Sequence, residues 1–207
     1  MPENALARLQ ACSRFGRRLL DSQPHLAEEI SLHLNEAFSR AAMQRFIDTP
    51  PCDSEAALHT RLRQLRRHVW VRTTARDLTA LATLQEVMLT YSDLAEVCLA
   101  AALDFHHAVL AERHGQPLDE QANPQQMVVV GMGKLGGREL NVSSDIDLIL
   151  LYPEEGQTDG AQPLSSHEFF VRLARKLNAA LSETPPTVTY SVLIYGCGLG
   201  ANRARWR

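Results

Sequence analysis

The sequence predicts an α+β fold, in which a helical N-terminal region precedes a small sheet with flanking helices. Three observations support this prediction. Apolar residues recur at helical spacing from Met1 to about His114. The stretch from Met127 to Tyr152 then reads as two short apolar strands separated by glycines. A last helical pattern begins at Ser165 and is expected to cover one face of the sheet.

Within the helical region, periodicity predicts a series of helices with identifiable ends. The expected segments cover about 6–19, 25–47, 54 onward, 77–89 and 92–113. Thr49 and the two prolines after it end the second segment, and Asp53 or Ser54 is expected to cap the third. Gly115 and Pro117 stop the last one. We expect this region to be a helical support.

The third helix is rich in arginine, and two interpretations are open. Some of these side chains could reach nucleotide phosphates or an acidic partner surface. Alternatively, they form the solvated face of a basic amphipathic helix, which needs no ligand. The arginines are Arg61, Arg63, Arg66, Arg67, Arg72 and Arg76.

Three histidines, His106, His107 and His114, are expected to lie at the surface rather than to bind metal, since adjacent residues do not share a helix face. The cysteines, Cys12, Cys52, Cys98 and Cys197, have neither zinc-site nor disulfide spacing.

Composition narrows the class of protein. The chain has 207 residues, of which 45% are apolar, and a net charge of −3, so it can bury a core and is not a general nucleic-acid binder. No signal peptide is expected at the N-terminus, and no apolar run approaches the length of a membrane span. We therefore expect a cytoplasmic protein that binds neither nucleic acid nor membrane.

The chemistry is concentrated between Met127 and Tyr152. Strand alternation places the side chains of Asp145 and Asp147 on one face, with apolar neighbours on the other. Two carboxylates so close repel each other, and a divalent cation relieves that repulsion. Hard oxygen ligands with open positions for phosphate suit Mg²⁺. We also expect Gly136 and Gly137 to open a short helix over about 138–142, whose free N–H groups would favour an anion.

The same glycines also fit other known patterns. Gly131, Gly133 and Gly136 match the G-x-G-x-x-G pattern of dinucleotide-binding folds, but there the acid follows at the far end of the next strand. A Walker A loop is excluded because no Lys-Ser or Lys-Thr pair follows. A tight turn between two buried strands, with Asp145 ending a helix, remains possible.

The string GMGKLGGRELNVSSDIDLILLY resembles the nucleotidyltransferase superfamily and, more closely, the family of bifunctional enzymes that add AMP to glutamine synthetase and remove it. Its glycines and the S-S-D-I-D run are similar to the N-terminal, AMP-removing half. The resemblance extends over about Leu58–Glu183 and includes the segment from Tyr91 to Ala95.

The resemblance implies a mechanism and a set of roles. Inorganic phosphate would attack the phosphorus of the adenylyl-tyrosine of glutamine synthetase, and ADP would leave. Asp145 and Asp147 are implied to be catalytic and to hold Mg²⁺. Nucleotide (ATP or ADP) and phosphate are the implied substrates, contacted by Lys134, Gly136, Gly137 and Ser144. Glutamine synthetase and a PII-type signal protein are the implied partners, either for catalysis or for a non-catalytic regulatory module.

After Glu183 the sequence departs from this family. The family continues with a strand similar to ADGYVFRVDLRLRP, whose acid is implied to be a third metal ligand; here no Asp or Glu follows. Codons for Pro186 through Trp206 can be chosen so that an earlier frame encodes a close match to the family. We expect a frameshift that truncated a longer enzyme and impaired it, with a genuine strand over Thr187–Tyr195 as the alternative.

The predicted division of the chain is a helical region over 1–117, a nucleotidyltransferase core over 118–184 and an aberrant tail over 185–207. The polar segment 118–126 is the expected boundary between the first two.

Overall fold

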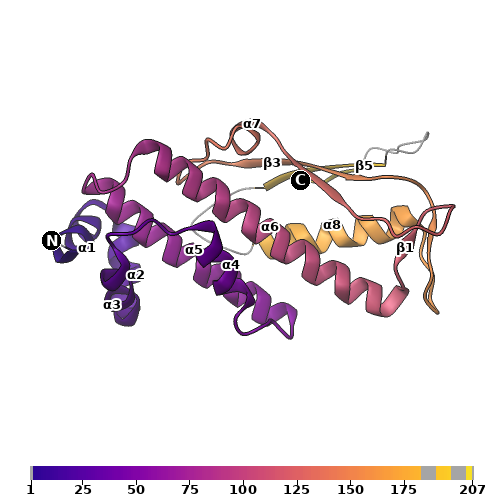
Figure 1. Cartoon of the computed structure of the whole chain (residues 1–207), viewed down its shortest axis with the longest axis horizontal. Helices are drawn as coiled ribbons and strands as arrows, with labels where there is room; N and C mark the ends of the chain where they lie inside the picture. The colour runs from indigo at the N-terminus through magenta and orange to yellow at the C-terminus, as the bar shows by residue number, and fades with distance from the viewer. Residues whose placement is uncertain (1, 183–189, 197–203, 207) are drawn as a thin grey trace. The chain divides into compact units, whose positions relative to one another are not determined.

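The computed structural model describes residues 2–182, 190–196 and 204–206, and it confirms the α+β class (Figure 1). The helices are α1 (Pro2–Cys12), α2 (Arg14–Ser22), α3 (Pro24–His33), α4 (Arg40–Asp48), α5 (Glu55–Leu78), α6 (Leu84–His114), α7 (Gly133–Gly136) and α8 (Ser166–Ser182). The strands are β1 (Pro117–Leu118), β2 (Val128–Gly131), β3 (Ile146–Tyr152), β4 (Gln157–Thr158), β5 (Tyr190–Gly196) and β6 (Ala204–Trp206).

The chain divides into two compact units, and the division lies elsewhere than predicted. The first unit comprises Met1–Val97 with Arg138–Val142, and the second comprises Cys98–Gly137 with Ser143–Arg207. The predicted boundary at residues 117 and 118 was placed at the end of a helix. The observed division falls within α6, because this 31-residue helix contributes residues to both units.

Helix boundaries in the first unit differ from the predicted ones at three places. The segment 6–19 is two helices, because the side chain of Ser13 accepts the N–H of Gly16 and caps α2. The segment 25–47 is also two helices, α3 and α4. No separate helix covers 77–89: α5 continues to Leu78, and α6 begins at Leu84. The predicted cap of α5 is confirmed, since Ser54 Oγ accepts the N–H of Ala57 at 3.2 Å.

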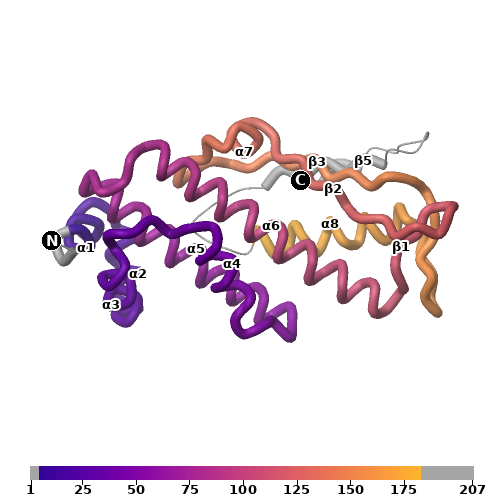
Figure 2. Tube along the Cα trace, in the orientation of Figure 1, coloured from indigo at the N-terminus to yellow at the C-terminus, as the bar shows by residue number. Residues whose placement is uncertain are grey.

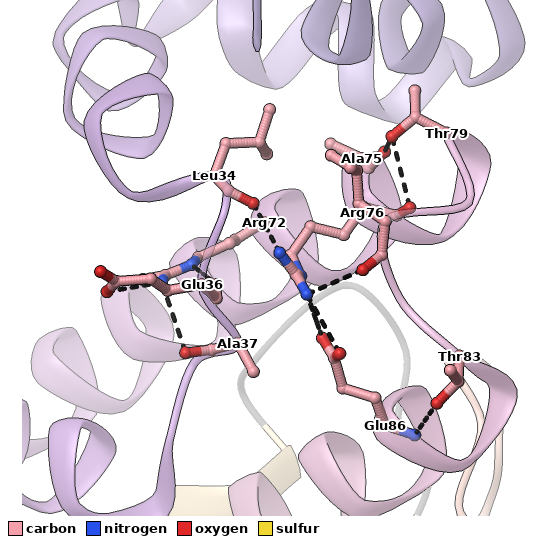
Figure 3. A network of polar contacts seen from close by, with 10 residues as sticks. Leu34, Glu36, Ala37, Arg72, Ala75, Arg76, Thr79, Thr83 and Glu86 are labelled. Carbon is pink, nitrogen blue, oxygen red and sulfur yellow. Dashed lines mark hydrogen bonds and ion pairs between the residues drawn. The ribbon is translucent and has the colours of Figure 1, made fainter. Parts of the chain in front are cut away.

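Three arginines of α5, Arg61, Arg72 and Arg76, match neither interpretation of the sequence, because they bind carbonyl groups inside the first unit. Arg72 Nε donates to Glu36 O at 2.8 Å, and Arg76 Nη1 donates to Leu34 O at 2.7 Å (Figure 3). Both acceptors follow the last turn of α3, where helix carbonyls lack intrahelical partners. Arg76 and Arg72 are 5% and 8% exposed. These side chains therefore bind carbonyl groups at the end of α3 and in the segment that follows it.

Arg61 has the same role at the end of α4. Its Nη1 donates to Phe46 O and to Thr49 O, both at 2.9 Å. Arg66 is also buried, at 4% exposed. Arg61, Arg72 and Arg76 thus join α5 to α4 and to the end of α3. The core of the first unit contains Leu9, Leu26, Leu34, Met43, Leu62 and Leu65.

The histidines at the end of α6 are not surface residues, contrary to expectation. His106 and His114 are 1% and 3% exposed. The His107 ring packs edge-on against Phe169 of α8, with ring centroids 5.4 Å apart. His114 Nδ1 lies 2.9 Å from Gln162 O. Residues of α8 contact His107 and His114, and the sequence of α6 did not indicate these contacts.

A pH dependence of stability follows from His107. Burial lowers its pKa, against the opposing charge of Asp104. The unfolded chain takes up this proton near pH ~6.5, so the stabilisation is complete above that pH and decreases as the pH falls toward the lower folded pKa. We expect the urea midpoint to fall less between pH 7 and pH 5 in His107→Gln than in wild type. The exposed His33→Gln is the control, and equal slopes in all three proteins would contradict the prediction.

Helix α6 meets the criteria of length and apolar composition for crossing a membrane, although no apolar run was expected to approach that length. Of its most apolar window, 44% is buried inside the protein. Buried Val97, Cys98 and Ala102 lie in this helix, which is the pattern of a core helix.

The second unit is built on a four-stranded sheet in the order β2-β3-β5-β6. β2 pairs antiparallel with β3, and β3 pairs parallel with β5. Helix α8 packs on one face, as Figure 1 shows, and its cap was predicted correctly: Ser165 Oγ accepts the N–H of Glu168 at 3.1 Å. Phe169, Phe170 and Leu173 of α8 are buried, and the Phe170 ring stacks on Tyr152 of β3.

The segment 118–126, predicted to be a boundary, belongs to the second unit. β1 pairs with β4, and Gln125 is 4% exposed. Its side chain accepts the N–H of Glu154 at 2.9 Å and donates to Ser166 Oγ at 3.2 Å. Polar composition suggested a linker, whereas the Gln125 amide joins the loop at Glu154 to the start of α8.

Of the predicted aberrant tail, residues 185–189, 197–203 and 207 lie outside the described residues. Tyr190–Gly196 forms β5 and aligns with β3, with Asp147 paired to Ser191. This strand overlaps the alternative prediction of a strand over Thr187–Tyr195. The frameshift itself stays a prediction.

Candidate functional site

The two acids lie together at the start of β3. Asp145 directly precedes the strand, and Asp147 is its second residue; both are exposed. Ile146, Leu148 and Leu150 are at most 2% exposed. The alternation that the sequence predicted is therefore present. Successive strand residues point to opposite faces, so Asp147 lies on the face opposite to the buried residues, together with half-buried Ile149 and Leu151. Asp145, two residues earlier, has the same alternation.

That face is opposite to α8. Tyr152 is an even number of residues from Ile146, Leu148 and Leu150, so it lies on the same face of β3. Its ring stacks on Phe170 of α8, with centroids 5.1 Å apart and an angle of 16° between the ring planes. The acids consequently lie on the face of the sheet turned away from α8. Neither carboxylate forms an ion pair or side-chain hydrogen bond with any part of the chain that the structure describes. Both remain available to a cation.

The glycines lie at and beside α7, a single helical turn in the connection between β2 and β3 (Figure 2). The predicted helix over 138–142 is absent; the helical turn is α7, which ends at Gly136. The N–H groups of Gly136 and Gly137 donate to Met132 O at 3.3 Å and Gly133 O at 3.0 Å. The glycine pair therefore closes a turn rather than opening one, and these two N–H groups are used internally.

Close packing explains part of the glycine pattern. A Cβ at Gly136 would lie 2.7 Å from Gly131 O, which is too close. Gly133 has a φ of +53°, in the left-handed region that glycine tolerates. The dinucleotide-binding alternative is excluded, because β2 and β3 are antiparallel and α7 has only four residues.

The other predicted contacts differ in accessibility. Lys134 lies exposed on α7, whereas Ser144 is 5% exposed. The turn is bound to the acid strand through the backbone, since Met132 N donates to Asp147 O at 2.9 Å. The assignment of Lys134, Gly136, Gly137 and Ser144 to phosphate contacts stays a prediction.

The donor set partly fits Mg²⁺. Two exposed carboxylates with hard oxygen atoms suit this ion. Within residues 2–182 and the two described strands beyond them, no group of three Asp, Glu, His or Cys side chains is placed to hold a metal. Asp145 and Asp147 are therefore two exposed carboxylates close together in the chain, and their assignment to Mg²⁺ stays a prediction.

Sequence reasoning assigned no role to Arg138, which directly follows the glycine pair. Its guanidinium donates to Asp93 at 2.6 Å and to Glu96 at 3.2 Å. Asp93 lies in the Tyr91–Ala95 segment that the resemblance had singled out. The sequence therefore indicated that the Tyr91–Ala95 segment matters. It did not indicate that this segment contacts Arg138.

Residues 3–193 match the family model for glutamate-ammonia ligase adenylyltransferase. Among curated proteins, the chain is similar to the bifunctional glutamine synthetase adenylyltransferase/adenylyl-removing enzymes of Nitrosomonas eutropha, Chromobacterium violaceum and Nitrosomonas europaea. The identities are 46%, 46% and 47%, over 83%, 88% and 83% of this chain. The alignments cover 19%, 21% and 19% of these relatives, so the chain spans about a fifth of their length.

Proposed function

Since the chain belongs to the glutamate-ammonia ligase adenylyltransferase family, we propose that it acts on glutamine synthetase and removes AMP from an adenylyl-tyrosine by phosphorolysis. The parent enzyme would also add AMP from ATP and so regulate nitrogen assimilation. The observation that supports this most is the exposed pair Asp145 and Asp147, beside a glycine turn whose sequence resembles the AMP-removing half.

In the proposed reaction, an oxygen of inorganic phosphate attacks the AMP phosphorus, and the bond to the tyrosine oxygen breaks. The products are ADP and a tyrosine hydroxyl, which takes up a proton. When bound, Mg²⁺ supplies positive charge that stabilises the negative charge on the phosphate oxygens. Such transfer needs positioning and charge more than a covalent nucleophile.

The residues of this chain would divide that task. Asp145 and Asp147 would hold the cation from one face of the sheet. Lys134, exposed on α7, would add a positive charge near phosphate. The small Gly136 and Gly137 would let the substrate approach the backbone, and Ser144 would offer a hydroxyl. With two carboxylates in place of three, we expect a slower reaction than in the parent enzyme.

Further partners follow from the same proposal. Glutamine synthetase would be the protein substrate, a PII-type signal protein the regulator, and the cytoplasm the compartment. We propose neither nucleic acid nor membrane as a partner.

The test mixes the purified chain with adenylylated glutamine synthetase, Mg²⁺ and inorganic phosphate, and measures ADP. Release of ADP that requires phosphate would support the proposal. ATP-dependent transfer of AMP to the unmodified enzyme would instead show the adenylylating activity. Binding to glutamine synthetase without turnover in either direction would show a non-catalytic regulatory module.

A further inference from the structure

A group of four charged side chains in the first unit surrounds the start of the segment that leads from the glycine turn to the acids. Arg138 Nη2 lies 2.6 Å from Asp93, and its Nη1 lies 3.2 Å from Glu96. Arg40 of α4 pairs with the same two carboxylates. Both acids lie on α6, so α6 holds Arg138 through two ion pairs.

A second contact fixes the same segment two residues later. Leu140 is 3% exposed, and its N–H lies 3.4 Å from the hydroxyl of Ser92, which is fully buried. Ser92 in turn donates to Met88 O at 2.9 Å. Residues 138–142 are thus anchored to α6 by a side chain and by the backbone, although the residues before and after them belong to the second unit.

The backbone conformation of Arg138 indicates that the arginine side chain has a role at this position. Its φ is +55°, a left-handed conformation that costs a non-glycine residue strain and that glycine adopts freely. A turn needing only this conformation would be better served by glycine. An arginine here is explained by its guanidinium, which forms two charge-assisted hydrogen bonds.

We infer that Arg138 is a positioning residue, which holds the segment 138–142 on Asp93 and Glu96 and thereby sets the placement of Ser144 and Asp145. This inference rests on the proposed function of the same site. The guanidinium of Arg138 binds the carboxylates of Asp93 and Glu96. Its effect passes along the chain: five residues lie between Gly137 and Ser143, and fixing them restricts where the first acid can lie.

The experiment uses a pair of substitutions that leaves the loop sequence intact, Asp93→Asn with Glu96→Gln. Amide hydrogen exchange is measured over residues 140–147 in the full chain. We expect exchange there to be about tenfold faster than in wild type, since the loop loses its anchor. Arg40→Gln is the matched control: it removes the other arginine from the same carboxylates without touching the loop and should leave this exchange unchanged. Unchanged exchange in the double variant would overturn the inference.

The substitution Arg138→Gly distinguishes an effect on the position of the catalytic groups from an effect on the stability of the fold. Glycine suits the φ at this position, so we expect an unchanged or higher thermal midpoint. The kcat of phosphate-dependent ADP release should fall about tenfold with KM for adenylylated glutamine synthetase unchanged, which corresponds to a misplaced catalytic group. Arg138→Lys should recover part of the loss. Faster exchange with an unchanged kcat would overturn the positioning role. If wild type releases no ADP, the proposed function fails, while the exchange measurements still decide whether Arg138 is the anchor.

Discussion

Asp145→Asn is expected to lower phosphate-dependent ADP release by about a hundredfold or more. The substitution keeps the size and exposure of the side chain but removes one of two negative charges that would hold the cation. A cation typically contributes several kcal/mol of charge stabilisation in such reactions, and each ~1.4 kcal/mol is a factor of ten in rate. The rate of ADP formation at saturating phosphate and Mg²⁺ measures the effect.

A second measurement on the same variant does not depend on turnover. An ion that binds only the folded chain raises its thermal midpoint. We expect millimolar Mg²⁺ to raise the midpoint of wild type and to have a smaller effect on Asp145→Asn. Glu154→Gln is the matched control, because Glu154 is an exposed acid that follows the same strand. Equal losses of rate in Asp145→Asn and Glu154→Gln would contradict a specific role for the pair.

The acid strand could be predicted because alternation is a local property. The position of a residue in β3 determines the face of the sheet on which it lies. The alternation in the sequence therefore predicts that Ile146, Leu148 and Leu150 are buried. The caps at Ser54 and Ser165 are local in the same sense, since the acceptor and its donor are three residues apart.

The glycine turn could not be predicted in detail, because its conformation depends on contacts across it. Gly136 opposes the carbonyl of Gly131, and Gly137 N–H closes the turn on Gly133. A pair of glycines is compatible with either end of a helix. The sequence placed the helix after the pair, and the structure places it before.

The arginines of α5 show a different limit. Their acceptors are carbonyl groups that come 36 and 42 residues earlier in the chain for Arg72 and Arg76. No periodicity within α5 reports where another helix ends. An arginine that binds the end of a distant helix therefore has the same kind of neighbours in the sequence as one that faces solvent or binds phosphate. Only the packing of α3 against α5 distinguishes these cases.

Arg76→Ala is expected to destabilise the chain by about 3–5 kcal/mol. The guanidinium of Arg76 is buried and donates to Leu34 O at 2.7 Å, to Leu81 O at 3.0 Å and to both carboxylate oxygens of Glu86 at 2.9 and 3.0 Å (Figure 3). Alanine would leave two carbonyl groups and a partly buried carboxylate without these partners. Losing one member of a buried ion pair costs more than the pair contributes, because the remaining charge stays desolvated.

Urea denaturation followed by circular dichroism measures this loss, with Arg63→Ala as the control on the same helix. Arg63 donates to Thr60 of its own helix at an exposed position, and we expect its removal to change stability by no more than about 0.5 kcal/mol. Arg76→Lys should be intermediate, since an ammonium group keeps the charge but not the planar set of donors that reaches three partners. A loss below about 1 kcal/mol in Arg76→Ala would mean that water replaces the guanidinium. In that case, the carbonyl groups at the end of α3 would not depend on α5.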